Sequence, residues 1–228
     1  MDIRLSFLLS AAIVFVGTHV ILSQSLRKPL VGLLGQTGFM AAYSLIAVVT
    51  LGWTVFAFGA APRGPYAWEP YSLWAWLAAM VLTYLALLLF IGSLAGNPAA
   101  PSPKAAELAA AKEAVGVYAI TRHPMMWAIA IWAFSHILLV PEPRTLILLG
   151  ALIVLALGGS AMQDRKKQQQ LGEAWTGWEG RTSFLPRPSG IASVRPLQWL
   201  IALALWLAIN WLHLPLGGVA AGVWRWVG

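Results

Sequence analysis

The side chains of this sequence best suited to hold a metal-centred cofactor are histidines. There are four of them, and there is no cysteine. His19 and His136 each lie inside a long apolar run. A polar ring in the hydrocarbon of a membrane is costly, so a histidine there is a candidate for function. Two imidazoles on different helices could hold one metal-centred cofactor between them. The competing interpretation is a histidine that hydrogen-bonds to a neighbouring helix.

A stripe of large side chains accompanies His136. It consists of Met125, Ile129, Trp132 and His136. This spacing places all four on one face of a helix, where Trp132 can form a pocket wall or simply pack. His136 is about 18 Å from the cytoplasmic end of its expected helix, and His19 is about 9 Å from that end of its own. Because His123 is closer in depth to His19, it stays open as an alternative second ligand.

Arg122 and His123 stand where the expected fourth helix enters the membrane, in the stretch YAITRHPMM. An arginine at this position can extend its side chain to lipid phosphates. It can also bind a carboxylate or phosphate through two parallel hydrogen bonds, and a heme propionate is such a carboxylate. The sequence leaves both interpretations open.

The elements that must position these side chains are membrane helices. The chain is 59% hydrophobic and only 10% charged, against roughly 25% charged residues in soluble domains. Six apolar runs meet or approach the roughly 20 residues that a spanning helix needs. We therefore expect a single all-α domain, a polytopic membrane helix bundle of about six transmembrane helices. The spans are expected near residues 5–25, 37–58, 73–94, 122–140, 145–163 and 197–216, with a cytoplasmic loop at 164–196.

The basic residues predict the orientation. With six spans, eleven Lys and Arg residues fall on one side and four on the other, and the basic side faces the cytoplasm. Both termini are then expected outside the cytoplasm, with the protein in a bacterial inner membrane. The net charge of +7 does not indicate nucleic acid, because the charges lie beside apolar spans. The expected partners are the lipid bilayer and a hydrophobic small molecule.

The stretch QDRKKQQQLGEAWTGWEGRTSFLPRP at residues 163–188 forms most of the expected cytoplasmic loop. Its basic residues can attract anionic lipid. Trp175 and Trp178 are three residues apart, and prolines follow them at the end of the stretch. This pattern is more typical of a folded cap than of a solvated linker.

Three stretches together resemble the NnrU family of membrane proteins. They are SLRKPLVGLLGQTGFMAAYSLIAV after His19, TRHPMMWAIAIWAFSHILL, and DRKKQQQLGEAWTGWEGRTSFLP. Within the family, the chain is most similar to the 15-cis-zeta-carotene isomerase branch, from about residue 14 to 187. The resemblance implies heme b held by His19 and His136, and isomerisation of one carotene double bond with ferrous heme. That branch has a cysteine where this chain has Ala133, so a thiolate ligand is excluded here.

Other function classes stay open beside the isomerase. Members of the NnrU family proper are linked with denitrification, and a heme site would also suit nitric oxide or redox sensing. The RHP motif followed by Glu173 and Arg181 resembles membrane methyltransferases of the isoprenylcysteine type, which use S-adenosylmethionine. Those enzymes usually have Tyr and Gly after RHP, whereas residues 126–128 here are Met, Trp and Ala. The third function class, beside the heme proteins and the methyltransferases, is a non-enzymatic membrane protein that acts as a partner or assembly factor for other proteins.

Overall fold

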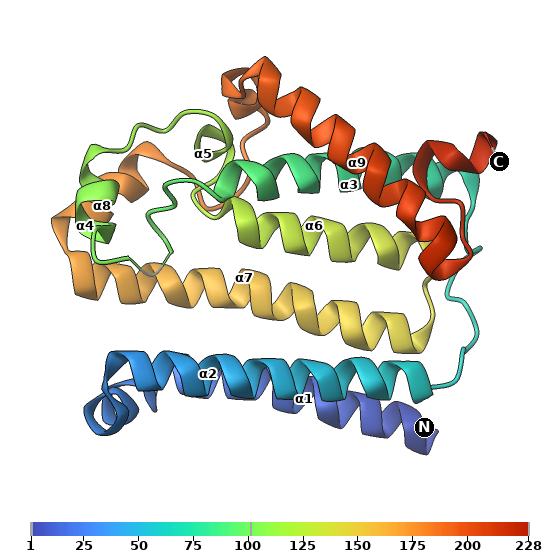
Figure 1. The fold of residues 1–228 in the computed structure, drawn as a ribbon, viewed down its shortest axis with the longest axis horizontal. Helices are drawn as coiled ribbons and strands as arrows, with labels where there is room; N and C mark the ends of the chain where they lie inside the picture. The colour runs from blue at the N-terminus through green and yellow to red at the C-terminus, as the bar shows by residue number, and fades with distance from the viewer. Residues whose placement is uncertain (1, 101, 228) are drawn as a thin grey trace. The chain divides into compact units, whose positions relative to one another are not determined.

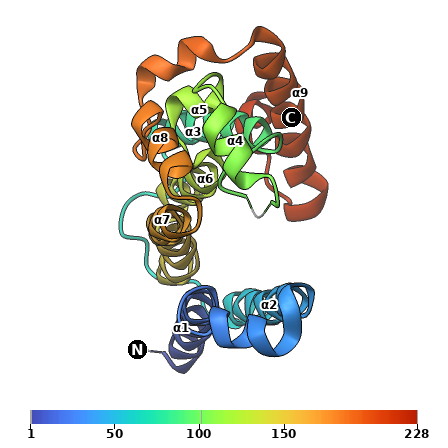
Figure 2. The same ribbon diagram turned by 90° about the vertical axis from the view of Figure 1, so that its left-hand side faces the viewer.

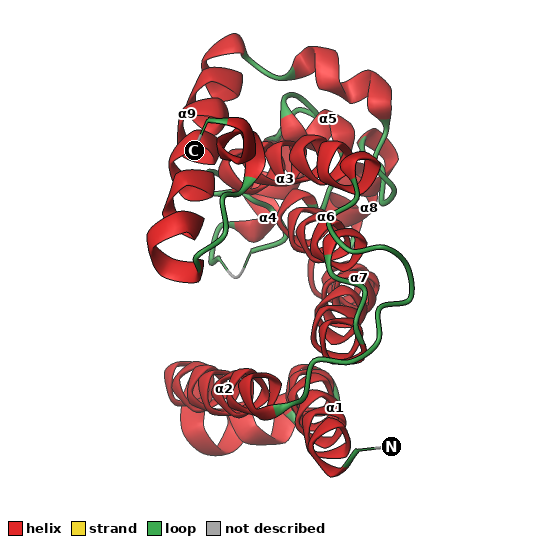
Figure 3. Cartoon of the chain, turned by 90° about the vertical axis from the view of Figure 1, so that its right-hand side faces the viewer, coloured by secondary structure: helices red, strands yellow, loops and turns green. Residues whose placement is uncertain are grey.

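The computed structural model describes residues 2–100 and 102–227, and within them all regular structure is helical (Figure 3). The helices are α1 (Ile3–Ser23), α2 (Arg27–Ala60), α3 (Leu73–Ser93), α4 (Ala105–Ala111), α5 (Val117–Ile120), α6 (Pro124–Leu139), α7 (Pro143–Leu171), α8 (Glu173–Arg181), η1 (Pro188–Ser193), α9 (Pro196–Gly217) and η2 (Gly222–Trp226). The expected all-α fold class is confirmed.

Five helices among the described residues are long and apolar enough to cross a membrane, judged by length and composition. They are α1, α2, α3, α7 and α9. The remaining expected span, the fourth at 122–140, corresponds to α6, an apolar helix of 16 residues. At 1.5 Å per residue α6 rises about 24 Å, somewhat less than the roughly 30 Å of a hydrocarbon core. The helices therefore agree with a polytopic bundle.

The chain divides into two compact units. The first contains the residues up to Tyr71 together with His136–Leu155, and the second contains Ser72–Ser135 and the residues from Ala156 onward. Helices α6 and α7 each contribute residues to both units. Both histidines of the expected heme site, His19 and His136, belong to the first unit.

The first unit is built on the α1–α2 hairpin. Helix α1 begins after Asp2, whose carboxylate accepts a hydrogen bond from the Arg4 backbone N–H (2.8 Å) and so caps the first turn. Small residues let the two helices approach, and the packed cluster contains Leu8, Ala11, Ala57 and Ala61, with Ile147 of α7 against it. Helix α2 is interrupted at Gly35, where φ is 71° and ψ is 170°.

The second unit packs α3 beside α9, as Figure 1 shows. Two hydrogen bonds tie these helices. The Tyr84 hydroxyl donates to the Trp199 carbonyl (3.0 Å), and the Trp206 indole N–H donates to the Thr83 hydroxyl (2.9 Å). The core of the unit also draws on α5, α6 and α8, and its buried residues include Leu88, Val117, Tyr118, Ala128, Trp175, Trp178 and Ala202.

Some element boundaries differ from those expected. Helix α2 begins at Arg27 instead of near residue 37, because residues 27–34 are helical before the interruption at Gly35. Helix α6 begins at Pro124 instead of 122, since Thr121 is extended and proline suits the first turn of a helix. The expected cytoplasmic loop at 164–196 begins with helical residues, because α7 continues as a helix to Leu171.

Candidate functional site

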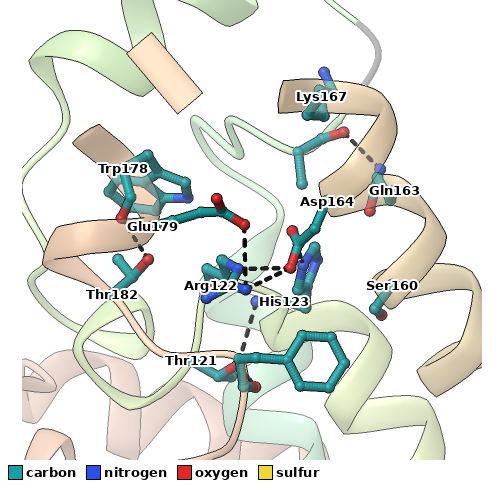
Figure 4. Close-up of polar contacts among 12 residues, drawn as sticks. Thr121, Arg122, His123, Ser160, Gln163, Asp164, Lys167, Trp178, Glu179 and Thr182 are labelled. Atoms are coloured by element: carbon teal, nitrogen blue, oxygen red, sulfur yellow. Dashed lines mark hydrogen bonds and ion pairs between the residues drawn. The ribbon is translucent and has the colours of Figure 1, made fainter. Parts of the chain in front are cut away.

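Arg122 and His123 lie in a polar cluster of the second unit, just before α6 (Figure 4). The backbone around them is pinned to residues 183–184. The Thr121 hydroxyl donates to the Phe184 carbonyl (2.8 Å), and the Arg122 N–H donates to the Ser183 carbonyl (2.8 Å). The same hydroxyl accepts the His123 N–H (3.2 Å). These bonds fix the backbone that carries the side chains of Arg122 and His123.

Asp164 of α7 binds both side chains. Arg122 donates from Nε (2.8 Å) and Nη2 (2.5 Å) to Oδ2, and His123 donates from Nε2 to Oδ1 (2.6 Å). The side chains of Arg122 and Asp164 are only 13% and 10% exposed, and His123 is buried. A buried ion pair is tolerated when further hydrogen bonds satisfy its remaining atoms, and both carboxylate oxygens of Asp164 have partners.

The cluster extends to α8 through Glu179. Its Oε1 lies 3.4 Å from Arg122 Nη2, and its Oε2 accepts a hydrogen bond from the Gln168 amide. Arg122 thus joins the start of α6 to α7 and α8. Trp175 and Trp178 of α8 are fully buried. The expectation of a folded segment rather than a solvated linker is therefore confirmed for α8.

Further contacts attach α8 to α4, and the end of α4 to α5. Arg181 Nη2 donates to the carbonyls of Ala109 (2.6 Å) and Ala110 (3.2 Å) at the end of α4. Lys112 Nζ lies 4.4 Å from the centroid of the Tyr118 ring. Burial lowers the pKa of the Lys112 amino group and raises the pKa of the Tyr118 phenol. The basic residues here serve contacts within the protein.

This cluster was only partly predicted from the sequence. Arg122 and His123 were candidates, and an arginine that binds a carboxylate was one of two interpretations. The carboxylates that it contacts are those of Asp164 and Glu179, whose pairing was not predicted. Acidic residues are scarce, with eight in the chain, and Asp164 directly follows an apolar run. The signal in the sequence that could have indicated this pairing was an acidic residue at the end of one expected span and an arginine at the end of another.

His19 lies in the first unit, on α1. Its Nδ1–H donates to the carbonyl of Phe15, one turn earlier (2.8 Å). A carbonyl can only accept, so in the neutral ring the lone pair is on Nε2. The ring is flanked by Phe15 (centroids 4.6 Å apart) and by Tyr43 of α2 (5.6 Å). Tyr43 was not predicted as a neighbour. His19 is thus a partly buried imidazole with aromatic walls and one nitrogen suited to bind a metal.

His136 lies near the end of α6, about 18 Å along the helix from Pro124. His19 is about 6 Å from the end of α1 at Ser23. One turn before His136, Trp132 is 42% exposed, and its carbonyl accepts a hydrogen bond from the Ser135 hydroxyl (2.7 Å). Trp132 is therefore on an exposed face of α6, whereas small residues form the buried face.

An iron porphyrin needs fewer protein ligands than a bare metal ion does. Among the described residues, no group of three or more His, Cys, Asp or Glu side chains could hold a metal ion. A porphyrin supplies most of the iron ligands itself, so the protein needs to add only one or two axial side chains. The fixed tautomer of His19 and the neighbouring aromatic rings meet that need. His19 therefore fits the role of one axial heme ligand.

Comparison with known proteins gives one clear match. The family model described as NnrU protein matches residues 7–221, which is nearly the whole chain. No curated protein and no solved structure gives a significant match.

Proposed function

The chain belongs to the NnrU family, and from that membership and the surroundings of His19 we propose that it binds heme b, with His19 and His136 as axial ligands. The observation that carries this proposal is the bond from His19 Nδ1 to the Phe15 carbonyl (2.8 Å). Such a bond fixes the tautomer and the orientation of a metal-binding histidine. Nε2 is then the ligating atom.

His123 is the weaker choice as second ligand. Its Nε2 is already bound to Asp164 (2.6 Å), and its side chain is buried. Ligation through that atom would require the bond to break and leave the partly buried Asp164 with less support. His136 has the further advantage of belonging to the same unit as His19. These observations favour His136.

The sharpest form of the proposed activity is cis–trans isomerisation of a carotenoid such as 15-cis-zeta-carotene. No acidic residue occurs in residues 3–23, 36–60, 73–93, 124–139, 143–163 or 196–217, so general-base catalysis within these apolar stretches has no carboxylate to use. Bound heme would supply redox chemistry that the side chains lack. The protein's own part is to hold the iron through imidazole and to offer apolar walls, Phe15 and Tyr43 among them, to a substrate arriving from the lipid.

The test is an isomerisation assay on protein reconstituted with heme in liposomes. Reduced protein is supplied with 9,15,9′-tri-cis-zeta-carotene, and the isomers are separated by chromatography. Loss of the 15-cis form is expected for the wild type and not for His19→Ala. His213→Ala is the matched control, because His213 makes the same bond to a carbonyl one turn earlier (2.8 Å) but is exposed on α9. No conversion by wild-type protein with an intact heme spectrum would contradict the isomerase.

A nitric oxide or denitrification-linked role is the second candidate, and Ala133 favours it. Ala133 is fully buried on α6, three residues before His136. Because it cannot provide a thiolate, the ligand exchange that the isomerase branch suggests has no counterpart in this chain. Under this alternative the heme spectrum responds to nitric oxide while zeta-carotene is not converted. Transfer of a labelled methyl group from S-adenosylmethionine to a lipid-linked thiol would replace both heme proposals.

A further inference from the structure

The first turns of α2 form a separate helical segment. Residues 27–34, the basic segment, precede the interruption at Gly35, where φ is 71°. Figures 1 and 2 show this part of α2 turned away from the axis of the remainder of the helix. A positive φ is readily adopted by glycine but strained for residues with a Cβ. The change of direction is thus encoded at Gly35.

The basic segment is not needed to cross the membrane. Helix α1 has 21 residues, which rise about 31 Å. Residues 36–60 rise about 37 Å on the same measure. Either length covers a hydrocarbon core of about 30 Å. The turn at residues 24–26, which follows α1, therefore lies at a membrane surface, and the basic segment begins directly after that turn.

The side chains of the basic segment combine cations with exposed apolar groups. Arg27 and Lys28 are at its start, and Leu33 and Leu34 are at its end, 80% and 45% exposed. The groups that Arg27 contacts in the structure are neutral. Its Nη2 donates to the Gln36 amide oxygen (3.4 Å), and its guanidinium lies 5.5 Å from the centroid of the Phe39 ring.

The surrounding sequence leaves these two cations uncompensated. No acidic residue occurs between Asp2 and Glu69. A short helix that combines basic residues with exposed leucines at a membrane surface is typical of segments that lie in the lipid interface. Basic residues near such a surface attract anionic phospholipid. Both the charge and the apolar surface therefore complement the same partner.

We propose that the basic segment is a docking site for an anionic phospholipid of the bilayer. Arg27 and Lys28 bind the headgroup phosphate, and Leu33 and Leu34 enter the region of the acyl chains. The contacts of Arg27 with Gln36 and Phe39 hold the segment back against the long part of α2. This site does not rest on the heme proposal, since none of its residues is a proposed heme ligand.

The position of the segment is tested by a spin label on the full-length protein. The chain has no cysteine, so Leu33→Cys gives a single labelling site, with Glu113→Cys on an exposed loop as the control. In liposomes of phosphatidylcholine and phosphatidylglycerol, the label at 33 is expected to collide more with oxygen than with a water-soluble nickel complex. The label at 113 should show the opposite. Preference for the nickel complex at position 33 would overturn the proposal.

The choice of lipid is tested by native mass spectrometry. Wild-type protein in detergent is expected to retain phosphatidylglycerol in preference to phosphatidylcholine. The double variant Arg27→Gln, Lys28→Gln should lose about 25-fold in that preference, from about fivefold per basic residue. The double variant Arg187→Gln, Arg195→Gln removes the same amount of charge from another part of the chain. It should keep the preference for phosphatidylglycerol. An equal loss in both variants would show an effect of net charge only and would overturn the site.

Two further results bear on the identity of the partner. Inorganic phosphate is expected not to compete with phosphatidylglycerol, because it cannot contact Leu33 and Leu34. Displacement of phosphatidylglycerol by inorganic phosphate would contradict a lipid site. Dimers that disappear in the Arg27→Gln, Lys28→Gln variant, without any lipid preference in the wild type, would show that a second copy of the chain binds there instead.

Discussion

At the scale of single residues, the clearest feature is the carboxylate of Asp164, which binds Arg122 and His123 with its two oxygens. Removing one partner of a buried pair costs more than the pair itself contributes, because the other charge stays buried without compensation. The same reasoning separates His123 from His19. His123 has its Nε2 bound to a carboxylate, whereas His19 has only its Nδ1 bound, to a carbonyl.

Asp164→Asn is expected to destabilise the protein by about 3 kcal/mol, because the Arg122 charge stays largely buried while the shorter of its two ion pairs is lost. The measurement is the unfolding temperature in detergent. Glu113→Gln removes an equal charge from an exposed loop and should change stability by less than about 0.5 kcal/mol. Equal effects of the two variants would show that the contact with Arg122 contributes little.

At the scale of the elements, α8 and η1 hold the start of α6 in place. Residues 183–184 bind Thr121 and Arg122, and Gly190 of η1 packs directly on the backbone of α5. A Cβ added at Gly190 would lie 2.4 Å from the carbonyl of Ala119. Real Cβ atoms do not come so close to backbone atoms, so this packing requires glycine.

Gly190→Ala should therefore lower stability by about 1–3 kcal/mol through overpacking. It should also expose the segment between α8 and α9 to protease. Gly180→Ala is the matched control, since Gly180 lies inside α8 with nothing within 4 Å of the added Cβ. There alanine is expected to be neutral or stabilising by up to about 1 kcal/mol. Rapid proteolysis of both variants, or of neither, would contradict the packing role of Gly190.

The sequence predicted most of the elements and half of the polar cluster. Apolar runs locate membrane helices well, because length and hydropathy alone decide whether a segment can cross a bilayer. They do not show where a helix ends in water, so the extension of α7 through Asp164 to Leu171 was missed. The pairing of Asp164 with Arg122 depends on which helices are neighbours. Spacing along one chain carries no such information.

At the scale of the whole molecule, the expected topology depends on α6 acting as a span. Helix α6 rises about 24 Å, whereas α7, with 29 residues, rises about 43 Å. Only residues 140–142 separate them, so the two helices run in opposite directions. If α6 crosses, the apolar helices make six spans and both termini lie on the same side. The eleven-to-four division of basic residues then predicts that this side is outside the cytoplasm.

Reporters fused to the C-terminus test this topology. Alkaline phosphatase, which is active only outside the cytoplasm, is expected to be active, and green fluorescent protein, which is fluorescent when fused on the cytoplasmic side, is expected to be dark. The same fusions after residue 113, in the loop between α4 and α5, should give the reverse pattern. A fluorescent C-terminal fusion would mean that one of the six helices, with α6 the shortest, does not cross.

The electronic absorption spectrum of the purified, heme-reconstituted protein tests the central claim most directly. We predict a Soret band with the features of low-spin heme held by two histidines. His19→Ala and His136→Ala should each convert the spectrum to high spin or lose the heme, while His213→Ala should leave it unchanged. A spectrum changed by His123→Ala and not by His136→Ala would assign the second ligand to His123. Absence of a Soret band, or a spectrum that no histidine variant alters, would contradict the account.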